Sequence, residues 1–195
     1  MAGISAFGST STPRSTVVTG PRWLLSITGG TVAAKGYLQK LVSMADALAT
    51  YELACELHPG KQIVVFGRSL GGAVAAQLAT VTSPAVLVLE ATFSSILDMT
   101  RELAPWTRFL PMGLLLKTRF DTVGYVSNST VPKLIFHGDS DRTVPHTSSA
   151  RIFAAARPQK KLHLIPGGDH DGLDLVDPAG YHGIQREFLA EHGAL

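Results

Sequence analysis

The feature that most constrains the fold is a strand-like run that passes directly into a glycine-rich turn. The apolar, β-rich run 62–66 is followed at once by Gly67-Arg68-Ser69-Leu70-Gly71-Gly72, and the stretch 73–79 then consists of helix-forming residues. A serine presented on a sharp turn needs a strand before it, a helix after it and small residues around it. The order strand, G-x-S-x-G, helix meets that need. Such a turn would lift the Ser69 hydroxyl above a helix N-terminus, where backbone N–H groups stabilise negative charge. Ser69 is therefore a candidate nucleophile.

A base and an acid are the next requirement, because a serine hydroxyl is a poor nucleophile at neutral pH. Two further predicted strands end in suitable side chains: the strand 132–137 is followed by Asp139 and Asp141, and the strand 161–165 by His170. The carboxyl ends of parallel strands gather at one edge of a sheet. The sequence therefore places a serine, an acid and a histidine in the order expected of a Ser-His-Asp hydrolase.

Strands and helices alternate along the chain, which favours an α/β fold with a mostly parallel sheet flanked by helices. The predicted strands are 23–27, 62–66, 85–89, 132–137 and 161–165, and the predicted helices are 38–58, 70–80, 146–156 and 179–191. With 195 residues, the chain is most simply one domain, 1–195. Within it we expect a loop-rich N-terminal segment at 1–22 and a lid-like helical insertion at 91–130.

Composition excludes several classes of protein. The chain is 45% hydrophobic and 16% charged, with a formal net charge of +2, which is typical of a compact globular protein. Lys160-Lys161 is the only adjacent basic pair, so nucleic-acid binding is not expected. The apolar stretch 109–116 is too short to span a bilayer, and the N-terminus lacks the pattern of a signal peptide. The single cysteine, Cys55, cannot form an internal disulfide, and we expect a cytoplasmic protein.

The chain resembles the α/β-hydrolase superfamily, in particular the serine aminopeptidases, lysophospholipases and Bem46-like proteins. The resemblance covers about residues 44–192 and rests on the following segments: Asp46-Ala47-Leu48-Ala49, the turn 67–72, Leu89-Glu90-Ala91-Thr92-Phe93-Ser94-Ser95, Lys117-Thr118-Arg119-Phe120-Asp121, His137-Gly138-Asp139-Ser140-Asp141 and Gly167-Gly168-Asp169-His170. It implies that Ser69 is the nucleophile, His170 the general base and Asp141, rather than Asp139, the acid that orients the histidine.

The N-terminal part departs from the family pattern. Family members usually have several strands before this point and a His-Gly loop that donates one N–H to the oxyanion. Here only residues 1–22 precede the first predicted strand, and Phe7-Gly8-Ser9 is a candidate remnant of that loop. The backbone N–H of Leu70 is the oxyanion donor that we predict. If the early strands are absent, an exposed sheet edge would favour a homodimer.

Two other interpretations fail on spacing. Thr28-Gly29-Gly30-Thr31 is similar to a dinucleotide-binding turn, but Ala33 and Lys35 stand where the later glycines should be. The acidic segment 169–174 is similar to a calcium loop, but its glycine is the fourth residue and not the sixth. We therefore expect neither a cofactor nor a metal.

The sequence thus predicts a serine hydrolase that cleaves small-molecule carboxylic esters or thioesters through an acyl-enzyme on Ser69. The alternative is a non-catalytic or impaired protein of the same fold that binds a ligand or a partner. Asp139, Asp171 and Asp174 are interpreted as loop carboxylates, and His137 as a structural histidine.

Overall fold

The computed structural model describes residues 23–28, 31–34, 37–40, 44–104, 106 and 120–195. The predictions made for residues 1–22, including the candidate loop Phe7-Gly8-Ser9, lie outside the described residues. The same holds for residues 105 and 107–119 of the predicted insertion.

A seven-stranded sheet forms the centre of the fold, with the strand order β3-β2-β1-β4-β5-β6-β7. Five strands are parallel, while β2 and β3 form an antiparallel ribbon beside β1. The strands are β1 (Trp23–Thr28), β2 (Thr31–Ala34), β3 (Tyr37–Lys40), β4 (Ile63–Arg68), β5 (Val86–Glu90), β6 (Lys133–Gly138) and β7 (Lys160–Ile165). The predicted α/β fold with a mostly parallel sheet is confirmed.

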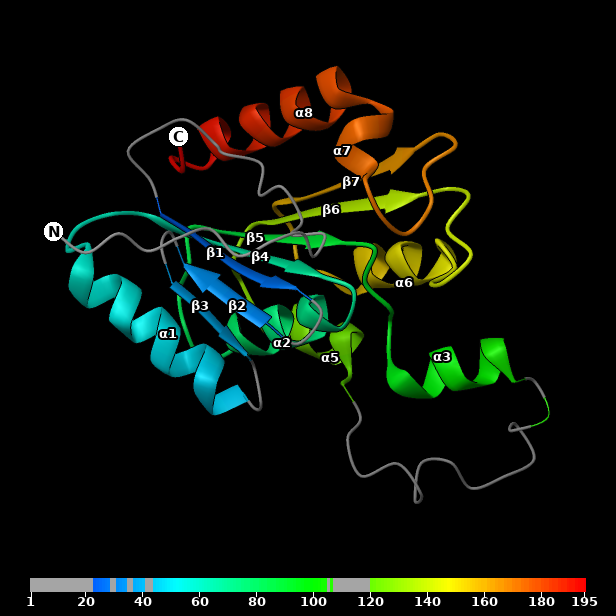
Figure 1. The fold of residues 1–195 in the computed structure, drawn as a ribbon, viewed down its shortest axis with the longest axis horizontal. Coiled ribbons are helices and arrows are strands. Elements are labelled where there is room, and N and C mark those ends of the chain that lie inside the picture. Colours follow the sequence, from blue (N-terminus) through cyan, green and yellow to red (C-terminus); the bar gives the residue numbers. More distant parts are fainter. Residues whose placement is uncertain (1–22, 29–30, 35–36, 41–43, 105, 107–119) are drawn as a thin grey trace, which may run out of the picture.

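Helices cover both faces of the sheet (Figure 1). They are α1 (Met44–Leu57), α2 (Leu70–Leu78), α3 (Ile96–Leu103), α5 (Thr122–Asn128), α6 (Thr147–Ala155), α7 (Leu173–Val176) and α8 (Pro178–Glu191). The helices α1, α2, α5 and α6 share one apolar core with the sheet, and α7 and α8 share a second core on the opposite face.

The central strands β4 and β5 are mainly apolar because both faces of the sheet are covered there, and their polar residues, Arg68 and Glu90, stand at the carboxyl ends. In β4, Val65 belongs to the core beneath α1 and α2, and the neighbouring Val64 belongs to the core beneath α8. All residues of β5 are buried. This double burial fixes the position of β4, and with it the turn that carries Ser69.

One predicted helix begins in the wrong place. We predicted a helix over 38–58, but residues Tyr37–Lys40 form β3, and α1 begins only at Met44. Leu38 pairs with Ala33 of β2, so ladder hydrogen bonds between strands override the local helical spacing.

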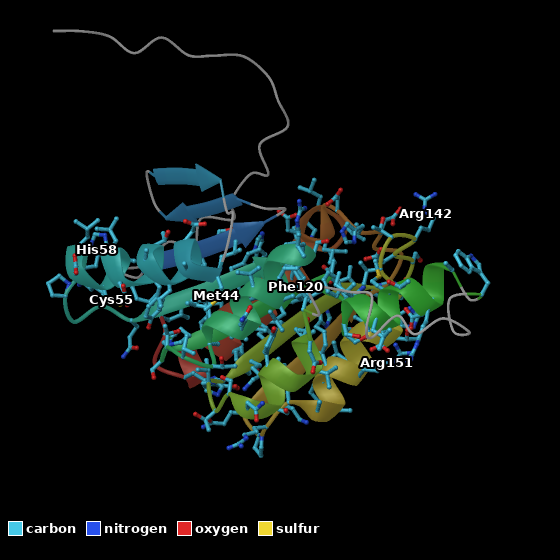
Figure 2. All side chains as sticks on the ribbon, turned by 90° about the horizontal axis from the view of Figure 1, so that it is seen from below. Met44, Cys55, His58, Phe120, Arg142 and Arg151 are labelled. Atoms are coloured by element: carbon cyan, nitrogen blue, oxygen red, sulfur yellow. The ribbon has the colours of Figure 1, made fainter. Side chains whose placement is uncertain are left out.

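The predicted insertion at 91–130 is described only at its two ends. The helix α3 extends away from the sheet and is tied to α6 by an ion pair of 2.7 Å between Arg151 Nη1 and Glu102 Oε1. Figure 2 labels Arg151 beside this helix. The helix α5, in contrast, buries Val126 in the core shared with α1 and α2. At its C-terminal end the predicted insertion is therefore part of the layer that covers the sheet. Among the described residues, the structure has no helix long and apolar enough to cross a membrane.

Candidate active site

Three side chains from three strand ends form a hydrogen-bonded row. The Oγ of Ser69 lies 3.1 Å from Nε2 of His170, and Nδ1 of His170 lies 2.9 Å from Oδ2 of Asp141. Asp139 stands outside the row, because its carboxylate accepts hydrogen bonds from Ser140 Oγ and from the N–H of Gly167. The structure therefore brings together the three residues singled out in the sequence, with Asp141 and not Asp139 beside the histidine.

Ser69 lies in a strained turn between β4 and α2. Its φ of 54° and ψ of −124° place it at a positive φ that non-glycine residues rarely adopt. Two hydrogen bonds hold the turn: Ser69 N–H donates to the carbonyl of Glu90 (2.9 Å), and Gly72 N–H donates to the carbonyl of Ser69 (3.0 Å). Strain of this kind persists only where the surroundings impose it.

Gly67 is required by the close approach of α2. A Cβ on Gly67 would lie 2.6 Å from the Cα of Gly72 and 2.7 Å from the carbonyl oxygen of Gly71. The helix begins at Leu70, and the first N–H groups of a helix have no acceptor within the helix. The N–H of Leu70 is the first of these, so it is free of any helical bond where charge would develop beside Ser69.

The carboxylate of Asp141 is surrounded by donors. Its Oδ1 accepts the N–H groups of Thr143 and Val144, each at 2.8 Å. Its Oδ2 is 2.9 Å from His170 Nδ1 and 3.2 Å from Nε2 of His137. Burial opposes ionisation of Asp141, but these hydrogen bonds hold the pKa of its carboxyl well below the usual range. Asp141 is therefore a carboxylate at neutral pH.

The neighbours of His170 make it a stronger base than an ordinary histidine. Its hydrogen bond with Asp141 raises the pKa of the imidazole, and burial only partly offsets this effect. An anionic Asp141 can only accept, so Nδ1 of His170 carries the proton in this network. Nε2 is then free to accept the Ser69 hydroxyl proton.

His137 was interpreted as structural, and the structure places it against Asp141. Its Nε2 lies 2.9 Å from the carbonyl oxygen of Val144, so Nε2 carries a proton and donates toward both Val144 and Asp141. Its Nδ1 is buried and has no hydrogen-bond partner among the described residues. The spacing of four residues between His137 and Asp141 was the one sequence signal for this contact.

Two arginines next to the row were missed in the sequence. Arg68 Nη1 forms an ion pair of 2.8 Å with Asp171 Oδ1, and Arg142 forms a two-pronged contact with Asp169. Asp171 was interpreted only as a loop carboxylate. One sequence signal pointed to these arginines, which is that each adjoins Ser69 or Asp141. Their ion pairs could not be predicted, because the paired residues lie far apart in the sequence.

A buried acid also supports the turn. Glu90 ends β5 and accepts a hydrogen bond of 2.5 Å from the hydroxyl of Tyr181 in α8. Burial raises the pKa of Glu90 and that of Tyr181. Because the carbonyl of Glu90 also accepts the Ser69 N–H, this pair anchors the turn from the α8 side. In the part of the chain that the structure describes, no group of three or more His, Cys, Asp or Glu side chains could hold a metal ion.

Comparisons with known proteins identify the relatives of the chain. Residues 37–186 match the model of the prolyl oligopeptidase family. An uncharacterized protein of Mycobacterium tuberculosis (strain H37Rv) is 35% identical over 154 residues, which cover 77% of this chain and 53% of that protein. Protein bem46 of Schizosaccharomyces pombe is 33% identical over 140 residues, which cover 67% of this chain and 44% of that protein. The chain thus spans about half the length of the curated relatives that it matches.

Solved structures share the fold at low sequence identity. An esterase of Pyrococcus furiosus superposes with a TM-score of 0.62 at 17% identity, over 76% of this chain and 61% of that one. The match to the family model over most of the chain, together with the shared fold, settles the family. The chain belongs to the prolyl oligopeptidase family of the α/β-hydrolase superfamily.

Proposed function

We propose that this protein is a serine hydrolase that cleaves carboxylic esters or thioesters through an acyl-enzyme on Ser69. The observation that carries the proposal is the row in which Ser69 Oγ lies 3.1 Å from His170 Nε2 and His170 Nδ1 lies 2.9 Å from Asp141. These distances fall within the reach of a nucleophile, its base and the group that orients the base. The positive φ of Ser69 adds support, because strain of this kind gathers at functional sites.

The mechanism follows from the donors and acceptors of the row. His170 takes the Ser69 proton as Oγ attacks the carbonyl carbon, and Asp141 stabilises the imidazolium that forms. The N–H of Leu70, at the start of α2, donates to the oxyanion. His170 then gives the proton to the leaving alcohol or thiol as the bond to the carbonyl carbon breaks. A water molecule gives a proton to His170 as it attacks the acyl-enzyme. His170 returns that proton to Ser69 Oγ as the bond between Oγ and the acyl carbon breaks, which releases the acid.

Two observations bear on the class of substrate. An esterase of known structure shares the fold, and the family as a whole is described by a peptidase activity. Esters and thioesters have better leaving groups than amides, and so they need less from an oxyanion hole. The cytoplasmic location and the homodimer stay predictions.

Hydrolysis of three substrates, each followed by absorbance, tests the proposal. The substrates are p-nitrophenyl acetate, a short acyl thioester followed with a thiol reagent, and a proline-containing peptide p-nitroanilide. We expect turnover of the first two, and a loss of about 10³-fold or more in kcat for Ser69→Ala and for His170→Ala. Turnover of the p-nitroanilide alone would contradict the ester or thioester assignment. Equal turnover by wild type and Ser69→Ala would contradict the role of Ser69.

A further inference from the structure

His170 stands between two aspartates, and each of them pairs with an arginine that adjoins another member of the row. Asp171 follows His170 and pairs with Arg68, the residue before Ser69. Asp169 precedes His170 and pairs with Arg142, the residue after Asp141. One ion pair therefore links the loop of His170 to the turn that contains Ser69, called here the nucleophile turn. The other links it to the turn that contains Asp141, called here the acid turn.

The histidine needs such links because it lies outside regular secondary structure. Residues 166–172 connect β7 with α7, and the side chain of His170 must meet partners from two other strand ends at once. A displacement of about 1 Å between reacting groups can cost on the order of 10²-fold in rate. Whatever fixes this connection therefore affects the rate directly.

The link to the acid turn is a fork. Arg142 Nε lies 2.9 Å from Asp169 Oδ2, and Arg142 Nη2 contacts the same oxygen. The other oxygen, Oδ1, accepts the backbone N–H of Arg142 (3.1 Å) and that of His170 (2.9 Å). A planar guanidinium that meets a carboxylate at two nitrogens fixes an orientation as well as a distance. Asp169 thus joins the backbone of the acid turn to the backbone of His170.

The link to the nucleophile turn is a single contact. Arg68 Nη1 lies 2.8 Å from Asp171 Oδ1, and Arg68 is only 24% exposed, whereas Asp171 is 74% exposed. Arg142 is 87% exposed and projects from the outer rim of the molecule (Figure 2). Exposed ion pairs contribute little to the stability of a fold. We therefore expect these two ion pairs to affect the position of His170 and not the free energy of unfolding.

We propose that Asp169 and Asp171 are positioning residues, which hold His170 in line with Asp141 and Ser69 through Arg142 and Arg68. The inference rests on the proposed function, since it assigns a role within the same site. Neither aspartate touches the reacting atoms. Their effect is on the fraction of molecules in which the row is correctly aligned.

The experiment measures kcat and KM for p-nitrophenyl acetate together with the rate of labelling by a fluorophosphonate. The variants are Asp169→Asn, Asp171→Asn and Asp171→Glu. The matched control is Glu187→Gln, which breaks an exposed ion pair of 2.7 Å with Lys161 at the other end of β7. All rates are taken on the high-pH plateau, where His170 is neutral. The amplitude of labelling counts folded sites, and the rate constant reports how well each site is aligned.

For Asp169→Asn and Asp171→Asn we expect a loss of roughly tenfold in kcat and in the labelling rate constant, with KM changed less than about twofold. Asp171→Glu should recover part of the loss because it restores the charge, and Glu187→Gln should match wild type. The inference is overturned if both Asn variants keep the plateau rate. It is also overturned if only the midpoint of the pH profile moves, because that result would mean a pure charge effect of Asp171 and Arg68 on His170. An inactive wild type would instead refute the proposed function.

Discussion

Replacing Gly67 by alanine is the substitution that most directly tests the turn geometry. The added Cβ would lie 2.6 Å from Ala75 Cβ, 2.6 Å from Gly72 Cα and 2.7 Å from the carbonyl oxygen of Gly71. Carbon atoms in favourable contact are about 3.5–4.0 Å apart, so Ala75 Cβ and Gly72 Cα must each retreat by about 1 Å. Two of the three contacted atoms belong to the backbone at the start of α2, which cannot rotate away.

The expected cost follows from that overlap. Overpacking of this kind costs about 1–3 kcal/mol of the free energy of unfolding. At about 2 kcal/mol the melting temperature falls by about 4–8 °C for a chain of this length. Because α2 carries the backbone next to Ser69, its retreat also misaligns the hydroxyl, and we expect a loss of about 10²-fold in kcat/KM.

Calorimetry and ester hydrolysis measure the two effects, with Gly183→Ala as the control. Gly183 lies exposed in α8, and a Cβ there would have no neighbour within 4 Å. This control should raise the free energy of unfolding by about 0.5–1 kcal/mol, through helix propensity alone, and leave the activity unchanged. If Gly67→Ala melts with wild type and keeps its kcat/KM, the close approach of α2 to β4 is refuted.

Four further outcomes are expected. The kcat/KM for ester hydrolysis should rise with pH around a midpoint above the ordinary histidine pKa of about 6.5, because His170 must be neutral to act as a base and its pKa is raised. A pH–rate profile with a midpoint below about 6 would contradict this expectation. His137→Phe should lower kcat by roughly tenfold, because it removes a hydrogen-bond donor from the buried Asp141. His137→Gln retains a donor and should lower kcat less, and steady-state kinetics compare the two variants. Tyr181→Phe should lower the free energy of unfolding in urea by about 1–3 kcal/mol, because Glu90 loses its hydrogen-bond donor in a buried site. Because the pKa of Asp141 is lower in the folded state, its contribution to stability is present above about pH 4 and is lost as pH falls through the folded pKa. The urea midpoint of Asp141→Asn should therefore change less between pH 7 and pH 3 than that of wild type.

The strands that lead to the site could be predicted because burial on both faces leaves a clear mark in the sequence. The stretches 63–66 and 85–89 are continuously apolar, and β4 and β5 begin within one residue of them. Since parallel strands end at one edge of the sheet, Ser69, Asp141 and His170 could be expected to lie together, as they do. Their catalytic roles stay a proposal.

The ribbon of β2 and β3 could not be predicted in the same way. Four-residue strands show no resolvable periodicity, and only their pairing, such as Ala33 with Leu38, defines them. The predicted helix, which starts at residue 38, therefore begins six residues before the observed start of α1 at Met44.

The surroundings of the site were hidden for another reason. The pairs Arg68–Asp171 and Tyr181–Glu90 join residues about one hundred positions apart, so only the folded chain brings them into contact. His137 could be assigned to a strand end, but its contact with Asp141 depends on how the turn after β6 folds back.

Peptide mapping by mass spectrometry after reaction with a fluorophosphonate tests the central claim most directly. At pH 8 we expect one phosphonyl group per molecule, bonded to Ser69 Oγ with loss of fluoride. Under the same conditions His170→Ala should remain unmodified, because no base lies 3.1 Å from the hydroxyl. A folded wild-type protein that stays unlabelled, or one labelled at a residue other than Ser69, would contradict the account.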